Sequence, residues 1–263
     1  QGALNAITLA RSMQGTKPWF AGEHKMSDSV ERLQAIRELY SLTLEKQEVA
    51  FVFLGLAGVL VRTPCRSLAF DISDMLSAKE MNEIKETDFL FFTHIHGDHF
   101  DKGKAISFYK KTDLHIIASE DVAEKLVEKI PADKLTAAIP GRSTSAVPIE
   151  GADILAIRGV HAGHCSQYRF REEGISIFHA GDSGYFGLGK QSANLAFLPT
   201  GSPSPWCAPE VALATARYVK PKVAVAMHGT NKQMSRFKDL MTREMSKVEV
   251  IIPNRFKLYK VTI

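Results

Sequence analysis

The chain has 263 residues, of which 45% are hydrophobic and 24% are charged, and its formal net charge is +4. These values are ordinary for a globular protein and exclude a disordered, collagen-like or fibrous chain. No apolar run approaches the roughly 20 residues that span a bilayer, so no transmembrane helix is predicted. Lysine and arginine are spread along the chain and mixed with acidic residues, whereas nucleic-acid binders usually concentrate their basic residues on one face.

Residues 1–26 are irregular, and their apolar stretch 3–10 lacks the preceding basic region of a signal peptide. Asp28 and Glu31 then have the spacing of a capping box, which predicts the start of a helix. Its apolar face has helical spacing and consists of Val30, Leu33, Ile36, Tyr40 and Leu44. That face has to be covered, either by the chain's own domain or by a second subunit in a homo-oligomer. We therefore predict an N-terminal extension at 1–47 and one domain at 48–263.

Strands come first in the main domain. Short β-rich runs at 49–54, 58–61 and 68–70 predict a strand meander. Ser77 and Glu80 form a second capping box that begins a helix over 77–85, and the wholly apolar run 89–92 predicts a buried strand. Further helices are predicted at 104–110, 119–129, 209–218 and 232–245, and further strands at 114–117, 154–159, 174–179, 195–198, 223–227, 248–252 and 256–261. This order predicts an α+β fold in which helices cover the sheets.

The most informative segment directly follows the buried strand at 89–92. Residues 93–99 read Thr-His-Ile-His-Gly-Asp-His, so three histidines and one aspartate lie within six positions: His94, His96, Asp98 and His99. Imidazole nitrogen and carboxylate oxygen together suit Zn²⁺, Mn²⁺ or Fe better than Ca²⁺ or Mg²⁺. Four solvated polar residues in a loop are the alternative, but this density at a strand end favours a metal site.

Four neighbouring ligands cannot complete two metal sites, so other segments have to contribute. Further donors follow predicted apolar strands, which would direct them to a common rim: His161, His164, Asp182 and His228. Gly181 and Gly184 flank Asp182 and would allow the backbone to come close to a metal.

This pattern resembles the metallo-β-lactamase superfamily, in particular the small metal-dependent hydrolases that include L-ascorbate-6-phosphate lactonase-like proteins. The HxHxDH motif is matched by residues 94–99, and the resemblance extends from about residue 49 to the C-terminus. Other matching segments are Leu-Gly-Leu-Ala-Gly at 54–58, Ala-Phe-Asp at 69–71, His-Ala-Gly-Asp at 179–182, Leu-Pro-Thr-Gly at 198–201 and the strand-to-histidine unit at 221–228. The resemblance implies a four-layer αβ/βα sandwich.

The resemblance also implies a ligand set. One metal would be held by His94, His96 and His164, a second by Asp98, His99 and His228, and Asp182 would bridge the two. The segment Ala162-Gly163-His164-Cys165 matches an A-x-H-S pattern in relatives and favours His164 over His161. We expect His161 and His179 to be hydrogen-bonded neighbours. We expect Asp71 to accept a hydrogen bond from a ligand histidine and fix its tautomer.

The implied cofactors are two divalent transition-metal ions, Zn²⁺ first, with Mn²⁺ or Fe as alternatives. A hydroxide bridging them would attack an ester, lactone, amide or phosphodiester bond of a small molecule. Asp98 would orient the hydroxide and carry a proton to the leaving group. The alternatives are a nuclease or phosphodiesterase acting on nucleic acid, and a non-hydrolytic metal-binding member of the fold.

Two further expectations concern the surroundings of the site. The loops 167–173 and 201–207 are expected to shape it, with Tyr168 and Trp206 as candidates for an apolar wall. Cys65, Cys165 and Cys207 are far apart and form no CxxC pair, which favours a reducing, cytoplasmic location. No membrane partner is expected, because no apolar run is long enough to span a bilayer. Cys165 is expected to be a buried structural residue.

Overall fold

The computed structural model describes residues 26–141, 143–149, 151–185, 187 and 191–263, with side chains from residue 29 onward. The segment predicted to be irregular therefore lies outside the described residues, apart from its last one, and so does the side chain of the predicted cap Asp28. The chain divides into two compact units, Gln1–Glu31 and Arg32–Ile263, so the predicted boundary at residue 47 falls inside the second unit. None of the helices in the described part is both long and apolar enough to cross a membrane.

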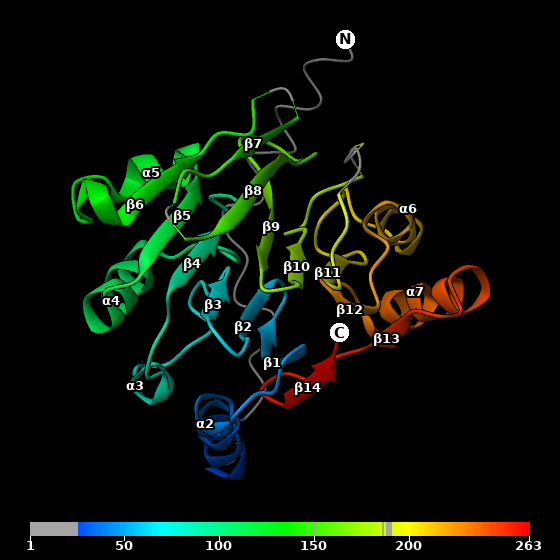
Figure 1. The fold of residues 1–263 in the computed structure, drawn as a ribbon, viewed down its shortest axis with the longest axis horizontal. Coiled ribbons are helices and arrows are strands. Elements are labelled where there is room, and N and C mark those ends of the chain that lie inside the picture. Colours follow the sequence, from blue (N-terminus) through cyan, green and yellow to red (C-terminus); the bar gives the residue numbers. More distant parts are fainter. Residues whose placement is uncertain (1–25, 142, 150, 186, 188–190) are drawn as a thin grey trace. The chain divides into compact units, whose positions relative to one another are not determined.

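Two seven-stranded sheets form the centre of the second unit (Figure 1). In spatial order, the first sheet consists of β14 (Leu258–Thr262), β1 (Glu48–Gly55), β2 (Gly58–Arg62), β3 (Ser67–Phe70), β4 (Phe89–Phe92), β5 (His115–Ser119) and β6 (Leu135–Ala138). The second consists of β13 (Glu249–Ile251), β12 (Val223–Met227), β11 (Leu195–Pro199), β10 (Ile175–His179), β9 (Ser166–Glu172), β8 (Asp153–Arg158) and β7 (Thr144–Ala146). Strands β3 to β6 are parallel, as are β10 to β13, so the loops after each set leave from one edge.

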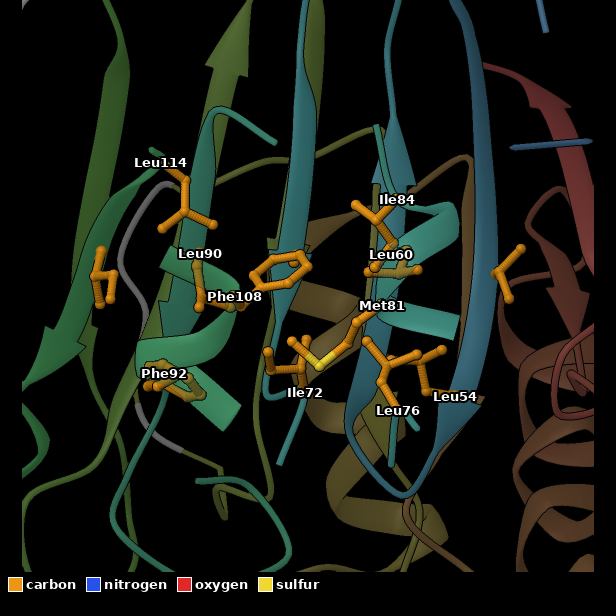
Figure 2. Close-up of a cluster of buried hydrophobic side chains, with 14 of the residues drawn as sticks. Leu54, Leu60, Ile72, Leu76, Met81, Ile84, Leu90, Phe92, Phe108 and Leu114 are labelled. Carbon is orange, nitrogen blue, oxygen red and sulfur yellow. The ribbon is translucent and has the colours of Figure 1, made fainter. Parts of the chain in front are cut away.

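Helices cover the outer faces of both sheets. Residues 32–41 of α2 (Met26–Ser41), together with α3 (Ala78–Glu83), α4 (Lys102–Thr112) and α5 (Glu120–Leu126), cover the first sheet, and α6 (Pro209–Val219) and α7 (Asn231–Glu244) cover the second. A short 3₁₀ helix, η1 (Ala132–Lys134), precedes β6. One apolar cluster fills the space between the sheets, a second lies under the first set of helices (Figure 2), and a third lies under α6 and α7. This is the predicted four-layer αβ/βα sandwich.

Local sequence signals explain several of these elements. In β4, Phe89 and Phe91 face the inter-sheet cluster while Leu90 and Phe92 face the helices, which is why the whole run is apolar. The predicted capping box at the start of α3 is present, with the Ser77 side chain accepting from the N–H of Glu80. Pro209 occupies the first turn of α6, as predicted.

The apolar face of α2 differs in part from the prediction. Ile36, Leu39 and Tyr40 are buried in the cluster under the first set of helices, so this part of the face is covered within the chain's own second unit. Val30 is exposed instead. Six residues correspond to about 600°, so Val30 lies about 120° around the helix from Ile36, outside the buried stripe.

Three strands were missed by the sequence analysis: β6, β7 and β9. The error matters most for β9, because its residues were expected to form a loop at the rim of the site. Tyr168 is fully buried between the sheets, and its hydroxyl donates to the carbonyl of Phe92 at 2.9 Å, so it forms no wall of a substrate site. The period-2 alternation of Tyr168 and Phe170 with Arg169 and Arg171 was the signal for this strand.

Candidate metal centre

The predicted metal-binding motif is the loop that follows β4, and Asp71, which follows the neighbouring strand β3, supports it. The Asp71 side chain is fully buried. It accepts hydrogen bonds from the N–H of Thr93 at 2.8 Å, from the Thr93 hydroxyl at 2.7 Å and from Nδ1–H of His99 at 2.8 Å. The predicted hydrogen bond from a motif histidine to Asp71 is therefore present. It places the lone pair of the neutral His99 ring on Nε2.

The first donor set consists of His94, His96 and His161, each of which offers a ring nitrogen within 4.8 Å of the other two. The Thr93 hydroxyl gives its hydrogen to Asp71, so its oxygen accepts from Nδ1–H of His94, 3.1 Å away. The lone pair of His94 therefore lies on Nε2. That atom is buried and has no hydrogen-bond partner in the described part of the chain.

The second donor set consists of Asp98, His99 and His228. Nε2 of His228 lies 3.2 Å from Nε2 of His99 and 3.4 Å from Oδ2 of Asp98. His228 follows β12 with a left-handed backbone, φ 47°, and its N–H donates to the carbonyl of Leu56 at 3.1 Å. Its own carbonyl accepts from Gly201 N–H at 2.6 Å, so neighbouring backbone holds this residue in place on both sides.

Asp182 lies between the two sets. Its Oδ1 is 3.5 Å from Nε2 of His94, and its Oδ2 is 2.9 Å from Nε2 of His161 and 3.9 Å from Nε2 of His99. Gly181 brings this loop against the motif: it has a φ of 59°, and a Cβ there would come within 2.9 Å of the Thr93 side chain. A glycine is required at this close approach.

The structure does not bring His164 to the other predicted donors. Its side chain is 61% exposed, and Nδ1 pairs with Glu120 at 3.1 Å. His161, which we expected to be a hydrogen-bonded neighbour, occupies the position predicted for His164. The other predicted donors lie together as expected: His94, His96, Asp98, His99, Asp182 and His228.

His179 and Cys165 lie next to the donors without belonging to either set. Nε2–H of His179 donates to the Ala57 carbonyl at 2.9 Å and its Nδ1 accepts from Gly181, so neither nitrogen is left for a metal. Cys165 is buried, with its sulfur within 4.8 Å of donor atoms of His94 and Asp182. Burial raises its pKa well above the usual range of a thiol, as expected for a structural cysteine.

Burial and the neighbouring carboxylates shift the pKa values of His94 and His99 in opposite directions. Burial, together with the neighbouring ring of His99, lowers the pKa of His94 to about 3. Burial alone would also lower the pKa of His99, but the carboxylates around it, first of all Asp71, raise that pKa to about 9. In the metal-free protein His94 is therefore neutral at pH 7, and His99 carries a proton that competes with a metal ion.

The carboxylates of the cluster are ionised. Burial alone would raise their pKa values, but His228 beside Asp98 and His161 beside Asp182 hold both pKa values well below the ordinary range of an aspartate. All ion pairs that these two carboxylates make in the described part of the chain are with histidines.

This donor set fits bound metal ions. Nε2 of His94 and Oδ1 of Asp182 are both buried, both without a hydrogen-bond partner among the described residues, and 3.5 Å apart. Nδ1–H of His161 donates to the carbonyl of Ala162, so the lone pair of the neutral ring faces the Asp182 carboxylate at 2.9 Å. Two electron-rich atoms in such an arrangement require a cation, either a proton or a metal ion.

Comparison with known proteins agrees with this geometry. A family model described as the beta-lactamase superfamily domain matches residues 72–229, more than half of the chain. A UPF0173 metal-dependent hydrolase from Thermococcus onnurineus (strain NA1) is 30% identical over 158 residues, which are 54% of this chain and 67% of that protein. The chain belongs to the UPF0173 metal-dependent hydrolases of the metallo-β-lactamase superfamily.

A second UPF0173 relative, from Thermococcus kodakarensis, is 28% identical over 194 residues, 67% of this chain and 82% of that protein. The metallo hydrolase Igni18 from Ignicoccus hospitalis superposes with a TM-score of 0.67 at 18% identity, over 82% of this chain and 99% of that one, and so shares the fold. The family match at 72–229 contains both donor sets and Asp182, and Asp71 immediately precedes it.

Proposed function

We propose that this UPF0173 protein hydrolyses an ester, lactone, amide or phosphodiester bond of a small molecule, with two divalent transition-metal ions as cofactors. The observation that carries the proposal is the pair of adjoining donor sets with the Asp182 carboxylate between them. Zn²⁺ is the first expectation, and the same nitrogen and carboxylate donors suit Mn²⁺ or Fe.

One ion would be held by His94, His96 and His161, the other by Asp98, His99 and His228, with Asp182 shared. When bound, such a pair of ions supplies hydroxide at neutral pH and takes up the negative charge that develops on the attacked group. The chain's contribution is to hold the donors in place. Asp71 fixes the ring of His99, and Thr93 fixes the ring of His94, so the lone pairs of both neutral rings would lie on the Nε2 atoms.

Asp98 is the residue that we assign to proton transfer. Its side chain is 30% exposed, whereas that of Asp182 is almost fully buried, so Asp98 is the carboxylate within reach of solvent and substrate. As an ionised carboxylate it would accept a proton from the attacking water and return it to the leaving group. A separate serine or cysteine nucleophile is not needed for this route.

The charges around the centre support a small-molecule substrate over a nucleic acid. Asp98 and Asp182 pair only with histidines among the described residues. Proteins that grip a phosphate backbone neutralise several phosphates with lysine and arginine. Here the bound ions would be the cations closest to the scissile bond, which is sufficient for one ester or phosphoryl group.

Metal analysis and a substrate panel test the proposal together. Protein purified without added metal should contain close to two transition-metal ions per chain by elemental analysis. It should hydrolyse at least one member of a panel of p-nitrophenyl esters, lactones and bis-p-nitrophenyl phosphate, and EDTA should abolish the activity until metal is restored. Two bound ions without hydrolysis of any panel member would favour the non-hydrolytic alternative. Activity that survives full metal removal would overturn the proposal.

A further inference from the structure

One partly exposed aromatic side chain contacts a donor of the first set. Trp206, in the loop between β11 and α6, is 37% exposed, and its ring centroid lies 4.4 Å from that of His161 at an interplanar angle of 45°. More than a third of Trp206 is therefore open to solvent next to a donor of the first set.

Two residues that flank Trp206 in its loop, Ser204 and Cys207, hydrogen-bond to the backbone of Asp182. The Ser204 hydroxyl donates to the backbone carbonyl of Asp182 at 3.0 Å, and the Cys207 thiol donates to the same oxygen at 2.9 Å. Gly184 packs against the back of the loop, where a Cβ would come within 3.2 Å of the Trp206 carbonyl and 3.3 Å of its Cβ. Trp206 is therefore placed by the same backbone that places Asp182.

Trp206 belongs to a strip of exposed apolar side chains. Seven large hydrophobic side chains are exposed in the part of the chain that the structure describes, and four of them are Val160, Tyr185, Trp206 and Tyr218. Gly184 connects the first three, since it bridges to Val160, contacts Trp206 and precedes Tyr185. The rings of Tyr185 and Tyr218 are 5.4 Å apart. Val160 and Trp206 thus flank Gly184 next to a donor of the first set, and an exposed apolar surface beside a polar centre is typical of a binding surface.

We propose that Trp206 is the substrate-contacting residue that selects an aromatic or similarly flat, uncharged group next to the scissile bond. This rests on the proposed hydrolase function. The indole offers a flat apolar surface, aromatic rings stack on it in offset or edge-to-face arrangements, and its neighbours in the strip carry no charge. The ring also touches His161, so a group that stacks on it lies within reach of the first donor set.

Kinetics with matched esters test this assignment. Acid release would be followed in a pH-stat with ethyl acetate, phenyl acetate and ethyl benzoate, for wild type, Trp206→Ala and Trp206→Phe. We expect Trp206→Ala to lower kcat/KM for at least one aromatic ester about tenfold more than for ethyl acetate, mainly through KM, and Trp206→Phe to restore most of it. Val127→Ala, which removes an exposed apolar side chain elsewhere, should change none of the three. Equal losses for all three esters would overturn the assignment while leaving the hydrolase function intact.

A binding measurement separates this inference from the catalytic proposal. The chain has two tryptophans, so Trp19→Phe leaves Trp206 as the sole indole fluorophore. In metal-loaded Trp19→Phe protein, benzoate should change the emission saturably and acetate should not, even if none of the esters is turned over. Identical responses to benzoate and acetate, or no response to either, would refute the role of Trp206. Failure of all hydrolysis, with a selective response to benzoate, would refute only the proposed reaction.

Discussion

The two donor sets differ in how firmly the protein holds them. His99 and His228 are fully buried, and each is fixed by a partner of its own: Asp71 for the first, and backbone groups on both sides for the second. In the first set, His96 is exposed, and the ring of His161 lies against a half-exposed tryptophan. The sets thus differ mainly in their most exposed donors, His96 in the first and Asp98 in the second, while the side chains of the other histidines are buried in both.

This difference predicts where substitutions act. Buried histidines whose rings are held by a hydrogen bond, such as His94 and His99, favour geometrically constant metal binding, because little has to reorganise when the ion enters. An exposed donor such as His96 loses less solvation on binding and leaves room for a ligand beside it. Substitutions of the buried histidines should therefore affect folding as well as metal binding, whereas a substitution of His96 should affect mainly metal binding and activity.

The largest effect is expected for Asp182, the residue that lies between the two sets. Asp182→Ala should lower kcat/KM at least about a thousandfold, because it removes the carboxylate between the sets and with it the constraint on both ions. Activity with the best substrate of the panel and metal content by elemental analysis would be measured together. Asp239→Ala, at an exposed position of α7, is the control and should behave as wild type. Wild-type turnover in Asp182→Ala would rule out a mechanism with two ions.

The second prediction tests whether His161 is the third donor of the first set. His161→Ala should lower metal content from about two ions per chain toward one and reduce activity at least about a hundredfold. His164→Ala is the matched control, since His164 lies in the same loop but pairs with Glu120, and it should keep both ions. Full metal in His161→Ala with metal loss in His164→Ala would restore the ligand set predicted from sequence.

The choice between these two histidines shows where sequence reasoning stopped. Four donors in one short loop were recognisable because their spacing after an apolar strand is a local pattern. The third nitrogen of the first set depends on the backbone of a turn, where Gly163 adopts a φ of 77° and His161 and His164 end on different sides. Local periodicity predicted most strands and helices, and the resemblance implied their four-layer arrangement, but β9 was missed because residues 167–173 were interpreted as a loop. Patterns within a short segment could be predicted from sequence, whereas contacts that depend on the backbone of a turn could not.

The third prediction concerns the hydrogen bond that Asp71 accepts from His99. Asp71→Asn keeps the size of the side chain and tolerates the left-handed backbone found here, φ 42°. It should lower metal affinity or kcat/KM about ten- to a hundredfold, because the neutral amide holds the His99 ring less firmly and makes Nε2 less basic. Competition with a chelator would measure the affinity. Unchanged affinity would mean that the bond between Asp71 and His99 serves folding alone.

The smallest effect is expected for the pH dependence of stability in metal-free protein. It is measured by comparing the free energy of unfolding of the wild type with that of Asp71→Asn. The pKa of His99 is raised from 6.5 to about 9, so its protonated form stabilises the fold fully below pH 6.5, and this contribution is lost as the pH rises through about 9. The pKa of Asp71 is lowered from 3.8, so its contribution is present above that value and is lost only in stronger acid. The free energy of unfolding of EDTA-treated wild type should therefore exceed that of Asp71→Asn most clearly between about pH 4 and 6.5, with the difference shrinking as the pH rises through 9. Urea denaturation at several pH values would measure this, and a difference that stays constant from pH 5 to 10 would show that His99 is not protonated beside Asp71.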